Sequence, residues 1–131
     1  MAEALVPAKG CNIETLDGSP YLTETSRPQG ATVQIAGWVI DPARQSMPAN
    51  AVLRLENQDR RDAWSVPLRP DIARPDVALD HGGQAAYTPS GFKVAVDTSA
   101  LPVGRYHLYI EYAAAGKSYA CDNGCMLALT H

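Results

Sequence analysis

The chain has 131 residues, of which 46% are hydrophobic and 19% are charged, and its formal net charge is −3 at pH 7. This is the usual length of one domain, and the apolar content is too high for a disordered chain. Eleven basic residues against fourteen acidic ones form no stripe that would bind a phosphate backbone. A nucleic-acid partner is therefore not expected.

The first residues and the apolar stretches bear on export and on membranes. A flexible N-terminal segment is expected over residues 1–10, and a single domain over residues 11–131. Met1 to Gly10 has no cationic start before an apolar run, so it does not resemble a signal peptide. The longest apolar stretch, Ile35 to Ile40, is far shorter than the roughly 20 residues of a membrane-spanning helix. We expect no direct membrane insertion, and we expect the chain to be part of a larger protein that carries any targeting or anchoring segments.

Alternation of apolar and polar residues predicts β-strands along the chain. Ten prolines spread over the sequence argue against long helices. The one helical candidate is a turn that opens at Pro75 and covers residues 76–79, because proline is favoured at the first helical position. In chain order, the predicted strands cover residues 11–16, 21–25, 31–41, 51–56, 63–68, 92–97, 106–112 and 118–129.

Turn residues separate these strands and define the fold class. Leu101-Pro102-Val103-Gly104 combines a proline with a fixed φ and a glycine that admits positive φ. Asp122-Asn123-Gly124 is predicted to form a three-residue hairpin loop that splits the last strand. Short strands at spacings of about 8 to 15 residues, with turns between them, indicate an all-β sandwich or barrel of about 7–9 strands with at most one short helical turn.

Two sets of residues carry a family resemblance that covers most of the chain from about Cys11. Leu101 to Ile110 resembles the turn and core strand of fibronectin type III domains and related sandwiches, with Tyr106 as the tyrosine that begins the strand. Four further segments are similar, in order, to immunoglobulin-like modules attached to bacterial membrane glycosyltransferases and other envelope proteins: residues 36–41, 74–78, 90–92 and 104–106.

This resemblance implies an immunoglobulin-like antiparallel β-sandwich that serves as a non-catalytic accessory domain. It implies a periplasmic or extracellular location in a bacterial envelope or secreted protein. The chain departs from the general pattern in its three cysteines.

Catalytic and metal-binding chemistry is not indicated by the sequence. His81, His107 and His131 are scattered over a loop, an outward strand position and the C-terminus, without metal-ligand spacing. Cys121 and Cys125 lack the second ligand pair of a zinc site. No nucleophile elbow or phosphate-binding loop is present. We therefore expect neither an enzyme nor a cofactor.

The segment Arg74-Pro75-Asp76 admits two interpretations. Arg74 and Asp76 could form a polar clamp for a sugar or a peptide, since proline limits where both side chains point. Alternatively, Asp76 caps the short helical turn and Arg74 bonds carbonyls or a carboxylate, which would fix the long loop in place. The structural interpretation is favoured because loops of this length need fixing.

The aromatic residues support a second hypothesis, a carbohydrate-binding module whose flat rings stack on sugar faces. The candidates are Trp64, Tyr87 and Tyr109, since Trp38, Phe92 and Tyr106 suit a core better. A third hypothesis is a structural spacer or a protein-interaction module that uses an exposed sheet edge. A protein or glycan partner is compatible with these hypotheses.

The three cysteines allow one disulfide and one remaining thiol. The envelope location that the resemblance implies is oxidising, so two of the three are predicted to be joined. Cys121 and Cys125 flank the predicted hairpin loop and are the slightly preferred pair. A bond from Cys11 to the C-terminal hairpin is the alternative, and it would constrain the unfolded chain more strongly.

Overall fold

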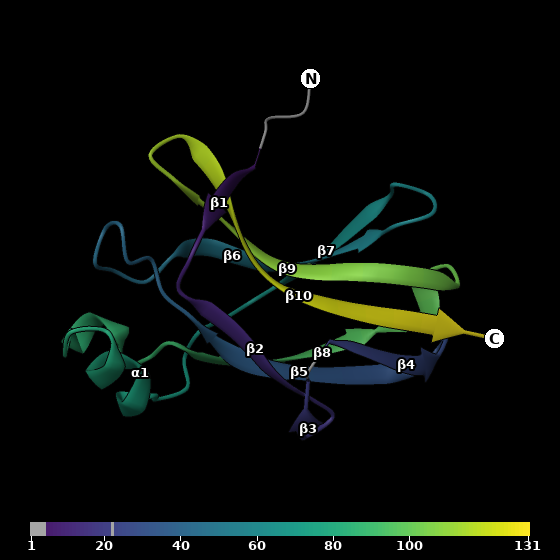
Figure 1. The fold of residues 1–131 in the computed structure, drawn as a ribbon, viewed down its shortest axis with the longest axis horizontal. Helices are drawn as coiled ribbons and strands as arrows, with labels where there is room; N and C mark the ends of the chain where they lie inside the picture. The colour runs from purple at the N-terminus through teal and green to yellow at the C-terminus, as the bar shows by residue number, and fades with distance from the viewer. Residues whose placement is uncertain (1–4, 22) are drawn as a thin grey trace.

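A computed structural model describes residues 5–21 and 23–131 of the chain (Figure 1). Two β-sheets lie face to face and form a sandwich, which confirms the predicted all-β class. The six-stranded sheet has the order β1-β10-β9-β6-β7, and β4 also pairs with β10. Its strands are β1 Val6–Ala8, β4 Glu24–Pro28, β6 Ala49–Asn57, β7 Ala63–Pro67, β9 Gly104–Ala114 and β10 Lys117–Thr130.

The four-stranded sheet has the order β3-β2-β5-β8. Its strands are β2 Cys11–Leu16, β3 Ser19–Pro20, β5 Thr32–Val39 and β8 Gly91–Asp97. Three short helical segments accompany the sheets: α1 Pro75–Asp80, η1 Ala85–Tyr87 and η2 Thr98–Ala100. The helical turn predicted at Pro75 is therefore confirmed as α1, which lies at one end of the sandwich (Figure 1).

The core lies between the sheets and follows from the alternation along the strands. In β9, Tyr106, Leu108 and Ile110 are completely buried. Arg105, which precedes them and points to the opposite face, is exposed. The hydroxyl of Tyr106 donates a hydrogen bond of 2.5 Å to the carbonyl of Pro102, so the predicted turn is tied to the strand that it precedes. Burial of each large apolar side chain contributes roughly 1.5–3 kcal/mol to folding.

A second, smaller apolar cluster lies beneath α1. Val77 and Ala78 are the buried positions of this helix, and they pack with Ile40 and Tyr87. Trp38 packs against the same cluster and not against the centre of the sandwich. The long connection between β7 and β8 therefore has its own small core, which holds it against the end of the four-stranded sheet.

The strand pattern differs from the predicted one in number and direction. Ten strands are present in the described residues, because β1 and β3 are very short strands that alternation does not reveal. Val6–Ala8 lies in the segment expected to be flexible, but it pairs with residues 119–121 of β10. The pairing of β1 and of β4 with β10 is parallel, so the sandwich is not purely antiparallel. Pairing between segments more than 100 residues apart leaves no local signal in the sequence.

The hairpin loop predicted at Asp122-Asn123-Gly124 is wrong. β10 runs through these residues, and β9 pairs Ile110 with Cys121 and Leu108 with Cys125. Residues 122–124 therefore form a bulge opposite Tyr109 alone. The reversal between β9 and β10 lies at Ala115 and Gly116, whose φ angles are 52° and 75°. The glycine signal was ambiguous because left-handed glycines serve bulges as well as turns, and Gly124 has a φ of 78°.

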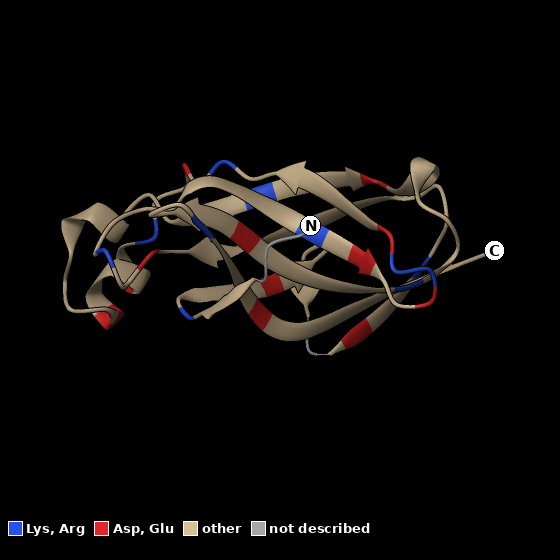
Figure 2. Cartoon of the chain, turned by 90° about the horizontal axis from the view of Figure 1, so that it is seen from above, with Lys and Arg blue, Asp and Glu red and all other residues tan. Residues whose placement is uncertain are grey.

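Charged residues are distributed over strands and loops of both sheets (Figure 2). Basic and acidic side chains are interspersed, and several form ion pairs such as Arg105 with Glu24 at 2.6 Å. Within the described part of the chain, none of the helices has the length and apolar character that crossing a bilayer requires.

Candidate functional site

Arg74 lies between the carboxylates of two residues that come from different parts of the chain. Its Nη1 and Nη2 donate to the Glu14 carboxylate at 2.6 Å and 3.1 Å. Its Nε and Nη2 donate to the Asp76 carboxylate at 3.0 Å and 2.9 Å. Hydrogen bonds first to Asp76 and then to Glu14 raise the pKa of Arg74, and the hydrogen bond from Arg74 lowers the pKa of Asp76.

This arrangement fixes the loop that carries Arg74. The Arg74 amide donates to the Thr88 carbonyl at 2.6 Å, and Glu14 belongs to β2 in the four-stranded sheet. A Cβ atom on Gly91 would lie 2.8 Å from Cγ of Arg74, so a residue without a side chain is needed where the loop crosses β8. The contacts correspond to the structural interpretation of Arg74. The N-cap residue of α1 is Arg74, however, and not Asp76, which lies in the first turn of the helix.

The three aromatic candidates are not open rings on the surface. Tyr87 is 2% exposed and Tyr109 is 6% exposed. Trp64 is half-buried and packs edge-on against Tyr106, with ring centroids 5.8 Å apart. A sugar that stacks on a ring needs one open face; Tyr87 and Tyr109 do not provide it, and the half-buried ring of Trp64 packs against the core.

Tyr109 occupies an outward position of β9 but is covered by its neighbours. Its hydroxyl donates to Glu56 Oε2 at 3.1 Å, the guanidinium of Arg54 lies 5.7 Å from its ring centroid, and His107 contacts it edge-on. Burial raises the pKa of Tyr109 to about 12. Strand alternation correctly places this side chain on the outer face, but it cannot reveal that long charged side chains cover it.

The histidines are held in separate places. His107 Nε2 lies 2.7 Å from Asp122 Oδ1 on the outer face of the six-stranded sheet. His81 follows α1, and its Nδ1 lies 2.8 Å from the Val77 carbonyl while its ring packs edge-on against Trp38. His131 is the last residue of the chain. Residues 5–21 and 23–131 contain no group of three or more His, Cys, Asp or Glu side chains that could hold a metal ion.

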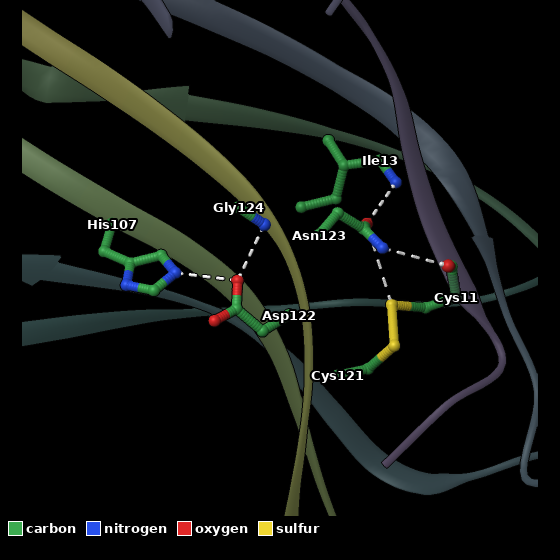
Figure 3. The surroundings of a disulfide bond; sticks show 7 residues. All are labelled: Cys11, Ile13, His107, Cys121, Asp122, Asn123 and Gly124. Carbon is green, nitrogen blue, oxygen red and sulfur yellow. Dashed lines mark hydrogen bonds and ion pairs between the residues drawn. A yellow bond between two sulfur atoms is a disulfide. The ribbon is translucent and has the colours of Figure 1, made fainter. Parts of the chain in front are cut away.

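The disulfide joins Cys11 to Cys121 (Figure 3). The slight preference for a Cys121–Cys125 pair is therefore wrong. The two α-carbons of the bonded pair are 6.2 Å apart, and the bond connects β2 in one sheet to β10 in the other. Cys125 is a free, buried cysteine, and burial raises the pKa of its thiol. A local Cys121–Cys125 pair would require a hairpin at residues 122–124, and these residues form a bulge instead.

The bulge in β10 makes a second connection between the sheets beside the disulfide (Figure 3). Asn123 accepts a hydrogen bond from the Ile13 amide at 2.8 Å and donates one to the Cys11 carbonyl at 3.2 Å. Asp122 accepts a hydrogen bond from the Gly124 amide at 2.8 Å, which closes the bulge. The side chain of Asn123 thus replaces the backbone partner that β2 lacks at this point. The sequence could not predict that Asn123 bonds to β2, because Asp-Asn-Gly is also typical of a turn.

A hollow of about 240 Å³ lies where β1 meets β10, and the sequence did not indicate it. Tyr112 and Tyr119 stack there with ring centroids 5.6 Å apart. The guanidinium of Arg44 lies 4.8 Å from the Tyr119 ring centroid, donates to the Tyr119 hydroxyl at 2.8 Å, and pairs with the buried carboxylate of Asp41 at 3.2 Å. Lys9 and two prolines complete the lining, which is Pro7, Ala8, Lys9, Pro42, Ala43, Arg44, Tyr112 and Tyr119.

Comparison with known proteins adds no assignment. A scan against protein-family models and a search of the curated proteins both found no match.

Proposed function

We propose that this chain is a non-catalytic accessory domain of a bacterial envelope or secreted protein, where it acts as a structural or interaction module. The observation that carries the proposal is that Arg74, one of the binding candidates in the sequence, forms its contacts inside the domain. Its guanidinium forms ion pairs with the carboxylates of Glu14 and Asp76. Arg74 and Asp76, the candidates for a polar clamp, thus hold a loop in place, which supports a structural role.

Two further features support an exported, immunoglobulin-like module. The Cys11–Cys121 disulfide suits an oxidising compartment. The hydrogen bond from Tyr106 back to Pro102 resembles the tyrosine corner of immunoglobulin-like sandwiches. The disulfide joins β2 to β10, however, and so differs from the bond between the second and sixth strands of antibody domains.

The test is an assay of the purified domain with its disulfide intact. We expect no hydrolysis of glycosidic, ester or peptide substrates. Turnover that a point mutation within this chain abolishes would contradict the proposal. The same preparation should contain the Cys11–Cys121 linkage when it is made in an oxidising compartment, and three free thiols there would contradict export.

Carbohydrate binding is the second candidate, and the hollow beside Tyr119 is the observation that favours it. Tyr87 and Tyr109 are buried and Trp64 is half-buried, whereas this hollow is lined by the cationic side chains of Lys9 and Arg44 beside Tyr119, which could donate hydrogen bonds to sugar hydroxyls. A glycan array separates the two candidates. Binding that is lost in Tyr119→Ala but retained in Trp64→Ala would support a glycan site there, and a blank array would support the scaffold role.

A further inference from the structure

β8 forms one edge of the four-stranded sheet. Among residues 5–21 and 23–131, β5 is the only strand that pairs with it. Ile72 covers the start of its free side through a bridge to Gly91. The edges of the six-stranded sheet are less open. Both β1 and β4 pair with the outer side of β10, and β7 ends in a proline, which has no N–H to donate. An edge of six residues, 92–97, therefore remains on β8.

The hydrogen bonds at the start of β8 show which of its residues bond to β5 and which face the free side. The Val39 amide donates to the Ser90 carbonyl at 3.1 Å, so even-numbered residues of β8 bond toward β5. The odd-numbered residues then point their N–H and C=O groups to the free side. Gly91 follows this rule, since it exchanges hydrogen bonds of 2.9 Å and 3.0 Å with Ile72. Lys93, Ala95 and Asp97 must therefore present their backbone donors and acceptors at the edge.

The same three residues also carry the exposed side chains of β8. Phe92 and Val96 are 1% exposed and point into the core, whereas Lys93, Ala95 and Asp97 lie on the outer face. Their cross-strand neighbours on β5 are uncharged: Ala36, Gln34 and Thr32. Along the edge, the cationic Lys93 and the anionic Asp97 therefore lie on either side of the small residue Ala95.

We propose that β8 pairs antiparallel with β8 of a second copy of this chain, about a twofold axis that passes beside Ala95. This register sets Lys93 of each copy opposite Asp97 of the other and sets Ala95 opposite Ala95. Opposed residues in a hydrogen-bonded pair lie about 5.5 Å apart at their α-carbons, a spacing that alanine accommodates without a clash. The three edge-directed N–H groups of each copy then find carbonyl partners, and the two four-stranded sheets become continuous.

The charges select this arrangement over its alternatives. Parallel pairing in register would set Lys93 beside Lys93 and Asp97 beside Asp97. A shift of two residues would set each charged side chain opposite Ala95 or opposite a residue outside the free edge 92–97. Opposite charges directly across an antiparallel pair are favourable, and like charges are unfavourable. Asp97 already accepts a hydrogen bond from the Ser99 amide at 3.0 Å, and a carboxylate has capacity for a further donor.

The interface is one strand wide, so we expect a weak and reversible dimer with a Kd between micromolar and millimolar. Sedimentation equilibrium of the disulfide-intact chain over this concentration range measures it. Lys93→Asp replaces two attractive pairs by two repulsive ones and should weaken the dimer roughly tenfold or more. Asp97→Lys should have a similar effect.

The decisive measurement combines the two variants. Each variant alone repels itself, but a mixture of Lys93→Asp with Asp97→Lys sets opposite charges across both pairs and should form a heterodimer. The double variant that exchanges the two charges should self-associate like the original chain. A chain that stays monomeric at millimolar concentration, or a dimer that Lys93→Asp leaves unchanged, would overturn the proposal. Thermal melts of each variant report whether loss of the Ser99 contact affects folding.

Cross-linking tests the position of the axis independently of charge. Ala95→Cys should give a covalent dimer under mild oxidation, because the two introduced thiols face each other. Ala63→Cys, on the exposed edge strand β7, is the matched control and should remain mostly monomeric. Preferential cross-linking through position 63 would move the interface to β7 and would refute pairing through β8.

Discussion

The guanidinium of Arg74 binds both oxygens of Glu14, at 2.6 Å and 3.1 Å, although 60 residues separate the two in sequence. The same guanidinium binds Asp76, so one side chain joins the β7–β8 connection to β2. Arg74 is 23% exposed, and its pairs are therefore less screened by water than fully exposed ones.

Replacement of this guanidinium should destabilise the domain. We expect Arg74→Ala to reduce the free energy of unfolding by about 1–2 kcal/mol, because it removes charge-assisted hydrogen bonds and leaves Glu14 without its partner. Urea denaturation followed by tryptophan fluorescence measures this. Arg60→Ala is the control, since Arg60 and Asp62 are 57% and 52% exposed and their pair should contribute little. Equal effects of the two variants would contradict the structural role of Arg74.

The disulfide should contribute far more than any surface pair. Its cysteines are 110 residues apart, and the chain-entropy account assigns roughly 4–5 kcal/mol to a loop of this length. The combined variant Cys11→Ala with Cys121→Ala should lose most of that free energy of unfolding. Cys125→Ala should lose much less, because it deletes only one small buried side chain.

Thiol chemistry provides a direct check of the connectivity. Non-reducing peptide mapping should recover Cys11 linked to Cys121 and a single alkylated Cys125. Cys125 is 1% exposed, and burial raises its pKa, so it should react with alkylating reagents only after unfolding. Rapid alkylation of the native chain, or a peptide that links Cys121 to Cys125, would contradict this assignment.

Asn123 should be the most sensitive residue of the bulge. Asn123→Ala removes the hydrogen bonds to Ile13 and Cys11, and we expect it to cost roughly 1–2 kcal/mol of unfolding free energy. Asn12→Ala is a matched control on β2, the strand that carries the Ile13 amide, because Asn12 is exposed. Hydrogen exchange of the Ile13 amide should accelerate in Asn123→Ala and stay slow in Asn12→Ala.

Alkaline pH should destabilise the fold, because burial opposes the ionisation of two tyrosines. Burial raises the pKa of both Tyr109 and Tyr112 to about 12, whereas an unfolded tyrosine ionises near 10. The unfolded state therefore releases these protons first, and stability should fall as the pH rises from about 10 to about 12. Denaturation midpoints across this range measure the effect, which Tyr109→Phe should reduce. A flat profile would show that these hydroxyls are open to solvent.

Acid should also destabilise the fold, through carboxylates that are held ionised. A hydrogen bond from the Gln34 backbone and then one from Arg27 lower the pKa of Asp17, and Arg74 lowers that of Asp76. Protonation then favours the unfolded state, whose carboxyl groups bind protons at higher pH. Stability should be complete above about pH 4 and should decline as the pH falls through the lowered values. Arg74→Ala should make this decline shallower.

Features set by local chemistry could be predicted from the sequence. Strands such as β2, β7 and β8, the turn before Tyr106, and the short helix at Pro75 follow from alternation and from the backbone limits of proline and glycine. The all-β class follows from these elements.

The tertiary structure decided everything that depends on partners distant in the chain. Glu14 is the partner of Arg74, Cys11 is the partner of Cys121, and β1 and β4 lie parallel to β10. Asp-Asn-Gly could form a turn or a bulge, and only the register of β9 against β10 selects the bulge. Covering of Tyr109 likewise depends on side chains from β6. Such choices are made by packing free energy summed over both sheets, which no local stretch of sequence contains.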